Sequence, residues 1–301
     1  MNFHFIFSII LSWKVTGFRK ILNIRKKKHG KKKQIENFDL EQICNSGQCF
    51  RMKKLAENKY RIIVGARYLD VYQKDGESIF YCSLEEFTEV WEEYFDLKRA
   101  YKLYIEKINP KDTYLVNAAK LGGGIRILKQ DLWEMIVSFL ISQQNNIVRI
   151  RRCIENICRE YGEEKITASG EHYYAFPKAE AFACLEEDDL KACNLGYRSK
   201  YVVRAAKGVV AGEIDLQAIE KMKYAKAKEE LLKIFGVGVK VADCICLFGL
   251  HHLEAFPVDT HINQALEKHY KRGFPKRRYK GFEGVLQQYI FYYELFGEKT
   301  E

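Results

Sequence analysis

The period of hydrophobic and polar positions changes along this chain from two to about 3.6. Residues 48–82 contain short alternating segments, and Asp75-Gly76 between two of them is typical of a tight hairpin turn. Ser83 then precedes an apolar residue, with Glu86 three positions on, which predicts a capping box at the start of a helix. This part of the chain therefore predicts an antiparallel meander followed by a helix.

From about residue 112 the pattern is helical almost to the end of the chain. Apolar residues recur at helical spacing in 131–143 and 146–162. Residues 188–212 and 225–250 each predict two helices joined by a tight glycine turn, and 282–296 predict a last helix. The expected fold class is α+β, with a small antiparallel β-sheet domain followed by a mainly α-helical domain.

The start of the chain is strongly basic, whereas the rest has no net charge. Residues 1–33 hold ten Lys and Arg and no acidic residue, and removing these ten from 50 basic and 40 acidic residues leaves 40 of each. Total charge therefore says nothing about nucleic acid, and a DNA-binding face must come from local clustering. We expect 1–33 to be a disordered extension, 34–115 the sheet-plus-helix domain and 116–301 the helical domain.

The first 13 residues, MNFHFIFSIILSW, are mostly apolar. This run is shorter than the ~20 residues of a membrane span. Its positive charges follow the apolar run and no small-residue cleavage site is evident, which argues against a signal peptide. A basic arm that tethers the protein to DNA and an amphipathic membrane-surface segment remain alternatives for the extension.

The nine cysteines show no metal-binding spacing. There is no CxxC pair, and no cysteine follows Cys246, so we expect neither a zinc site nor an iron–sulfur cluster. In a chain of this length they are typical of reduced, mostly buried thiols in a cytoplasmic protein.

Gly236-Val237-Gly238 lies between two predicted helices. Glycines permit left-handed backbone angles and the close approach of another backbone. Because a helix follows directly, the amides from about Gly238 to Val241 lack helical partners and can bind an anion such as a DNA phosphate. Taken alone, the motif fits a plain turn between helices that binds nothing somewhat better than a phosphate site.

Lys240 and Asp259 favour the functional interpretation. Lys240 lies in the first helical turn, where the positive end of the helix dipole disfavours a cation, so it suits a nucleophile better than a stabilising residue. The helix to about Leu250 is roughly 15 Å long. Residues 251–258 can span up to ~27 Å, so Asp259 can return to Lys240. Asp259 is also a candidate helix N-cap, and the two roles are compatible.

The segment GVGVKVADCICLF followed by PVDTH resembles the helix-hairpin-helix, Gly/Pro-Asp superfamily of DNA base-excision glycosylases, and its lysine resembles the 8-oxoguanine DNA glycosylase branch. The resemblance covers roughly residues 34–301. Four further motifs support it: NSGQCFRM at 45–52, SQQNNIVRI at 142–150, NLGYRSKYV at 194–202 and GVLQQYIF at 284–291.

The resemblance implies a bifunctional DNA glycosylase and AP lyase that excises 8-oxoguanine opposite cytosine from double-stranded DNA. Lys240 would attack C1′ of an extruded nucleotide, and the resulting Schiff base would permit β-elimination. Asp259 would stabilise the oxocarbenium-like sugar and assist proton transfer. His261, Gly236 and Gly238 would contact DNA phosphate.

For the base, the resemblance assigns Gly47 as the residue whose carbonyl accepts the N7–H of 8-oxoguanine, which ordinary guanine lacks. Phe291 and Cys244 would sandwich the flipped ring, and Gln287 would bind its Watson–Crick edge. As single residues, these fit a turn glycine, a core aromatic, a buried thiol and a solvated glutamine.

On the opposite strand, the resemblance implies that Tyr197 wedges into the vacated stack, with Arg198 and Arg149 reading the cytosine. Asn146 belongs to the same DNA-binding set. The chain departs from the better-known members at Gln144, where they carry an asparagine. Residues 268–280 hold seven Lys and Arg and no acid, which fits either a phosphate-tracking patch or a solvated loop.

Two alternatives belong to other classes of function. A non-catalytic helix-hairpin-helix protein has no need of Lys240 and Asp259. Glycosylases for alkylated bases carry the aspartate without the lysine, and the pyrimidine-lesion and adenine-mismatch branches usually carry a four-cysteine iron–sulfur loop. We expect no cofactor, although a cation at the hairpin-phosphate site is compatible with the pattern. We also expect a monomer without membrane association, cytoplasmic and nucleoid-associated in a bacterium or nuclear in a eukaryote.

Overall fold

The computed structural model describes residues 30–297, so most of the predicted extension lies outside the described residues. The sheet begins three residues earlier than expected. Lys31–Gln34 form strand β1, and Lys31 lies opposite Phe80 in an antiparallel register. Strand β1 therefore overlaps the last three residues of the expected extension, because pairing with a distant strand orders a segment whose composition is typical of an extension. The domain boundaries stay a prediction.

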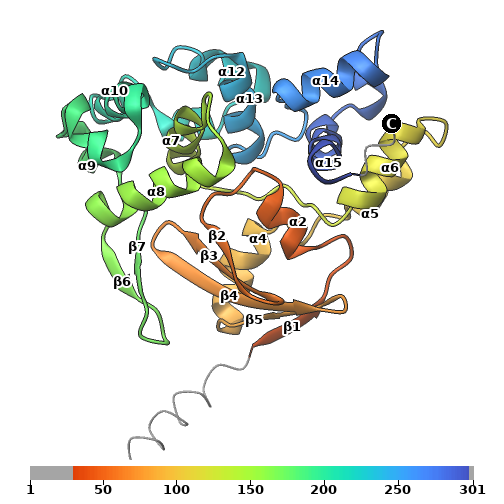
Figure 1. Ribbon diagram of the computed structural model, residues 1–301, viewed down its shortest axis with the longest axis horizontal. Coiled ribbons are helices and arrows are strands. Elements are labelled where there is room, and N and C mark those ends of the chain that lie inside the picture. Colours follow the sequence, from red (N-terminus) through yellow and green to blue (C-terminus); the bar gives the residue numbers. More distant parts are fainter. Residues whose placement is uncertain (1–29, 298–301) are drawn as a thin grey trace, which may run out of the picture.

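The first part of the chain is an antiparallel sheet with the strand order β1-β5-β4-β3-β2. Its remaining strands are β2 (Met52–Ala56), β3 (Lys59–Val64), β4 (Arg67–Lys74) and β5 (Glu77–Phe80). Asp75 and Gly76 both have positive φ, 51° and 77°, so the predicted tight turn between β4 and β5 is confirmed. The sheet forms the lower layer in Figure 1, beneath the helices.

Helices make up most of the remainder, which confirms the predicted fold class. They are α2 (Leu40–Asn45), α3 (Leu84–Glu86), η1 (Phe87–Trp91), α4 (Glu92–Tyr94), α5 (Lys102–Glu106), α6 (Thr113–Gly122), α7 (Leu132–Ser142), α8 (Ile147–Tyr161), α9 (Ala179–Ala183), η2 (Glu187–Cys193), η3 (Gly196–Arg198), α10 (Ser199–Val210), α11 (Leu216–Glu220), α12 (Tyr224–Leu231), α13 (Val239–Phe248), α14 (Thr260–His269), η4 (Lys276–Tyr279) and α15 (Glu283–Phe296). No helix among residues 30–297 is long and apolar enough to cross a membrane.

Three local features differ from the expectations. Ser83 caps α3 by accepting from the Glu86 amide at 3.0 Å, but the Glu86 carboxylate accepts from the buried Trp91 indole instead of closing a capping box. A buried indole N–H needs an acceptor, and the Glu86 carboxylate meets this need instead of binding the backbone amide of Ser83. The helix expected before the Gly196 turn is the 3₁₀ helix η2. The short hairpin of β6 (Glu164–Ile166) and β7 (His172–Tyr174) was not predicted, because its strands of three residues are too short to show an alternating pattern.

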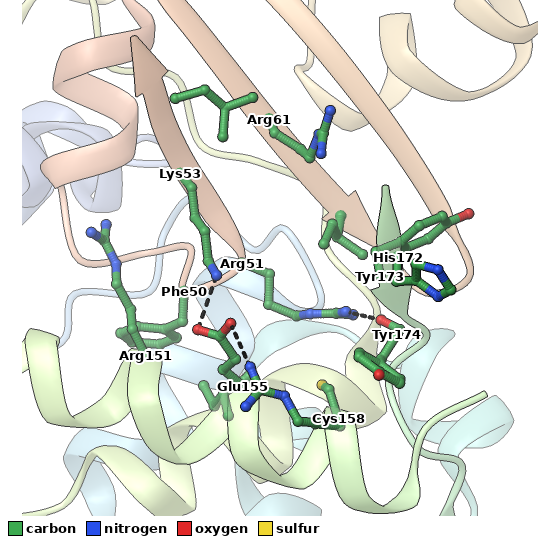
Figure 2. A pocket seen from close by; sticks show the side chains of 14 residues that line it. Phe50, Arg51, Lys53, Arg61, Arg151, Glu155, Cys158, His172, Tyr173 and Tyr174 are labelled. Atoms are coloured by element: carbon green, nitrogen blue, oxygen red, sulfur yellow. Dashed lines mark hydrogen bonds and ion pairs between the residues drawn. The ribbon is translucent and has the colours of Figure 1, made fainter. Parts of the chain in front are cut away.

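Arg51 and Glu134 join the sheet part to helix α7. Their side chains are 6% and 9% exposed, and Arg51 Nη1 lies 3.8 Å from Glu134 Oε2. Arg51 also donates to the carbonyl of Tyr174. Figure 2 shows this arginine near Glu155, which pairs with Lys53. Arg51 and Glu155 line a cavity of about 250 Å³, and Glu155 also pairs with Arg159. Burial raises the pKa of Glu134 to about 7, against the attraction of Arg51.

This buried pair predicts a pH-dependent stability. A carboxyl whose folded pKa is raised above its unfolded value destabilises the fold as pH rises from about 4.5 to 7. Arg51→Met removes the attraction, so we expect a loss of about 3 kcal/mol of unfolding free energy at alkaline pH and a smaller loss at acidic pH, where Glu134 is neutral. Urea unfolding on either side of that range measures both.

The double variant Arg51→Met with Glu134→Gln is the control for this prediction. It removes the titrating group, so the difference between the two pH values should shrink. An equal loss at both pH values in the single variant would contradict the assignment of the penalty to Glu134.

Candidate active site

The turn between α12 and α13 is built on two glycines with different requirements. Gly236 has φ +90°, and a Cβ there would lie 2.6 Å from the ring of Tyr201. Gly238 has φ −95°, and a Cβ there would meet no atom within 4 Å. The first backbone hydrogen bond of α13 runs from Ala242 N to Gly238 O at 2.9 Å. The amides of residues 239–241 therefore lack helical partners, as an anion site requires.

The two glycines give a matched pair of variants. Gly236→Ala forces a left-handed backbone and a clash, so we expect about 1–3 kcal/mol of lost stability. Gly238→Ala meets neither obstacle and should leave the unfolding free energy nearly unchanged, while its methyl group lowers affinity for duplex DNA. Thermal unfolding and DNA titration separate the two effects. Similar stability losses in both variants would contradict this description of the turn.

All six residues proposed for chemistry and base binding line one cavity close to the turn. Its lining consists of Ser46, Gly47, Phe139, Lys240, Cys244, Phe248, Pro257, Asp259, Gln287, Gln288 and Phe291. The cavity volume is about 50 Å³.

Lys240 and Asp259 reach this cavity from the starts of two helices. Lys240 is the second residue of α13, and its Nζ lies 5.7 Å from the centroid of the Phe139 ring. Asp259 is the N-cap of α14, and its Oδ1 accepts from the Ile262 amide at 2.9 Å. Both sequence predictions of local position are confirmed. Asp259 Oδ2 is not used by the cap bond, so the carboxylate can serve the cavity as well.

Cys244 lies one turn after Lys240 on the same helix, and it is buried. Burial raises the pKa of its thiol to about 11, against the opposing effect of the Lys240 ammonium. The thiol is therefore neutral near pH 7 and offers a soft apolar surface to the cavity.

Gly47 and Phe291 lie against each other in the lining of the cavity. Gly47 has φ +73°, and a Cβ at this position would lie 3.1 Å from Phe291 Cε1. A larger residue is therefore excluded by backbone conformation and by space. The His261 ring packs edge-on to Phe291 with 6.0 Å between centroids, so this exposed residue of α14 adjoins a lining residue of the cavity.

Gln287 and its neighbour Gln288 are each 3% exposed on α15. Gln287 Nε2 donates to the carbonyl of Pro257, and Gln288 Nε2 donates to Gln287 Oε1, both at 3.1 Å. Gln288 therefore orients the Gln287 amide. Its role was not predicted, although it stands in the same motif, and its own Oε1 is buried without a hydrogen-bond partner.

Gln48 fixes the loop that carries Gly47 and was also not predicted as a site residue. This side chain is fully buried and donates to the carbonyl of Arg126 at 2.9 Å. Its Oε1 accepts from the Leu128 amide at 2.8 Å. The sequence motif contains Gln48, but only the fold shows which segment it binds.

The residues expected on the opposite strand lie around residues 143–146. Asn146 caps α8 by accepting from the Arg149 amide at 2.9 Å, and the Arg149 side chain is exposed. Tyr197 is 45% exposed. Arg198 is buried, and its guanidinium donates to the carbonyls of Gln143 and Gln144. In this structure Arg198 therefore holds the loop, and reading a base requires it to leave these acceptors.

Comparisons with known proteins match both parts of the chain. Residues 32–136 match the family "8-oxoguanine DNA glycosylase, N-terminal domain", and residues 137–279 match the "HhH-GPD superfamily base excision DNA repair protein" family. The 8-oxoguanine glycosylase/lyase of Clostridium acetobutylicum, solved with DNA containing cytosine opposite 8-oxoG, is 35% identical with a TM-score of 0.82. That match covers 88% of this chain and 96% of the other. The chain belongs to the 8-oxoguanine DNA glycosylase family.

Two curated relatives are named as enzymes of this kind. The N-glycosylase/DNA lyase of Saccharomyces cerevisiae is 36% identical over 52% of this chain and 45% of its own length, so this chain spans less than half of the yeast protein. The probable N-glycosylase/DNA lyase of Methanothermobacter thermautotrophicus is 29% identical over 85% of this chain and 93% of its own length.

These comparisons confirm the predicted family and the class of enzyme, a DNA N-glycosylase and DNA lyase of base excision repair. The role of each site residue stays a prediction. Among residues 30–297, no group of three or more His, Cys, Asp or Glu side chains has an arrangement that could hold a metal ion.

Proposed function

We propose that this family member excises 8-oxoguanine opposite cytosine from duplex DNA and then cleaves the strand as an AP lyase. The observation that carries the proposal is the single cavity lined by Lys240, Asp259, Gly47, Gln287 and Phe291, next to a turn with unpaired amides. A turn that only binds DNA has no need of this cavity or of an amine inside it.

The proposed chemistry uses the side chains of this chain. The Lys240 ammonium first gives up a proton, and its free amine then attacks C1′ of the extruded nucleotide. The C1′–N9 bond breaks, and the base leaves with the bonding electrons. Opening of the sugar yields an imine between C1′ and Nζ. Loss of a C2′ proton then expels the 3′ phosphate by β-elimination. The Asp259 carboxylate opposes the positive charge that develops on the sugar and assists these proton transfers.

Base selection in this proposal depends on hydrogen bonds. The Gly47 carbonyl accepts the N7–H of 8-oxoguanine, whereas guanine presents a lone pair there. An unpaired buried carbonyl costs about 1–3 kcal/mol, or roughly 5- to 150-fold in rate. Gln287, oriented by Gln288, binds the Watson–Crick edge, and Phe291 and Cys244 enclose the ring.

The remaining contacts concern the DNA strands. The amides beside Gly236 and Gly238, together with His261, bind phosphates near the lesion. A cation at this site would assist only phosphate binding. Tyr197 fills the vacated stack, and Arg149, Asn146 and a released Arg198 contact the cytosine. We further propose that the enzyme acts as a monomer where the genome is kept, in the nucleoid region of a bacterial cytoplasm or in a nucleus.

Single-turnover excision from matched duplexes tests this function. The lesion is placed opposite each of the four bases, and a guanine–cytosine duplex and an alkylated-purine duplex serve as comparisons. We expect the fastest release of 8-oxoguanine opposite cytosine, and release of guanine slower by at least about 10²-fold. Faster release of the alkylated purine, or binding without excision, would favour one of the two alternative functions.

A further inference from the structure

The segment from Lys268 to Lys280 is an exposed basic surface without acidic partners. Seven of its side chains are cationic and exposed: Lys268, Lys271, Arg272, Lys276, Arg277, Arg278 and Lys280. Within residues 30–297, none of the seven lies within 4.0 Å of a carboxylate, whereas exposed lysines elsewhere, such as Lys226 and Lys207, form ion pairs. The chain outside residues 1–33 has as many acidic as basic residues, so this surface is a local positive excess.

Aromatic side chains attach this segment firmly to the helical core. Tyr279 is fully buried and packs against Phe274 with 5.7 Å between ring centroids. Phe274 packs in turn on Phe256 at 4.8 Å, and the Tyr270 hydroxyl donates to Asp112 at 3.0 Å. The backbone that carries the cations is therefore anchored to the helical core, unlike that of a freely moving solvated loop.

Two cations of the basic segment, Lys268 and Lys276, are linked through helix α14 and Phe256 to the part of the chain that carries Asp259. His261 and Lys268 are seven residues, or about two turns, apart on α14, so they share its exposed face at about 10 Å separation. Within the segment, Lys276 Nζ lies 5.0 Å from the centroid of the Phe256 ring, and Phe256 is three residues before Asp259. In Figure 1, α14 ends in the loop that returns to α15.

We propose that this segment binds the sugar-phosphate backbone of duplex DNA beside the extruded nucleotide, without reading its sequence. A regular polyanion fits seven unpaired cations on a fixed surface better than a single bound ion does. The inference rests on the proposed function only in requiring that duplex DNA is the substrate.

The test uses undamaged duplex DNA and the full chain. The variant carries Lys271→Gln, Arg272→Gln and Arg277→Gln, none of which lines the cavity. The matched control loses three cations that are paired with Glu77, Glu92 and Glu163, through Lys32→Gln, Lys98→Gln and Lys165→Gln. Binding is measured over a range of salt concentrations, and thermal unfolding verifies the fold.

We expect the salt slope of log K to fall by about 2–3 units in the variant, since each phosphate contact contributes about 0.9. The control should retain the slope of the original protein, and single-turnover excision at saturating enzyme should be unchanged in both. An unchanged slope, or equal losses in variant and control, would overturn the proposal and leave the segment to solvent or to an acidic protein. Because this DNA has no lesion, a failure to excise 8-oxoguanine would count against the proposed function alone.

Discussion

Replacing Lys240 with glutamine is expected to abolish the covalent adduct that borohydride traps on lesion DNA and to slow excision by about 10³-fold or more. Glutamine keeps much of the side chain's length but has no amine that can attack C1′. DNA binding should persist, since the amides of residues 239–241 belong to the backbone. Single-turnover kinetics on a duplex with 8-oxoguanine opposite cytosine measures the loss.

The matched control for this variant is Lys233→Gln. Lys233 lies on the other side of the glycine turn and pairs with Glu230 at 2.7 Å on the surface. Its loss should leave the adduct and the excision rate unchanged. An undiminished adduct in the Lys240 variant would exclude the proposed nucleophile.

Asp259 allows catalysis and stability to be separated with two substitutions. Asn is as good an N-cap as Asp, so Asp259→Asn should keep the bond to the Ile262 amide and change the unfolding free energy by only a few tenths of a kcal/mol. It removes the charge that opposes the sugar cation, so excision should slow by about 10²–10³-fold. Asp259→Ala should lose the same activity and about 1 kcal/mol of stability.

Urea unfolding and single-turnover excision, measured on both variants, check this prediction. If Asp259→Asn excises at nearly the original rate, the carboxylate is only a helix cap. If both variants lose equal stability, the cap bond does not contribute as described.

Local chemistry explains which parts of the fold could be predicted from the sequence. Asp75-Gly76, Gly236 and the Asp259 cap each depend on the backbone angles or donors of a few neighbouring residues, and all three are found as expected. β1 could not be predicted in this way, because its lysines gain a strand only by pairing with β5. Glu86 differs for the same reason, since the demand of the buried Trp91 is not visible in the capping motif.

The residues of the candidate site also fall into those that local sequence predicts and those that only the fold brings together. Lys240 at a helix start and Asp259 at a cap follow from sequence spacing, whereas Gly47 joins them only through the fold. The resemblance to a family supplied that grouping. It did not reveal that Gln48 holds the Gly47 loop, because Gln48 bonds to Leu128, which lies 80 residues away and outside the motifs. It also did not reveal that Gln288 orients Gln287, because that bond depends on how the two buried side chains are arranged.

The most direct test of the central claim is to locate the covalent bond. Native protein is trapped with borohydride on DNA containing 8-oxoguanine opposite cytosine, digested, and the peptide bearing the sugar remnant is identified by mass spectrometry. The proposed mechanism predicts that the remnant is on Lys240 Nζ. A remnant on another amine, for example that of Lys228 beside Asp243 on the neighbouring helices, or the absence of any adduct during active excision, would contradict it.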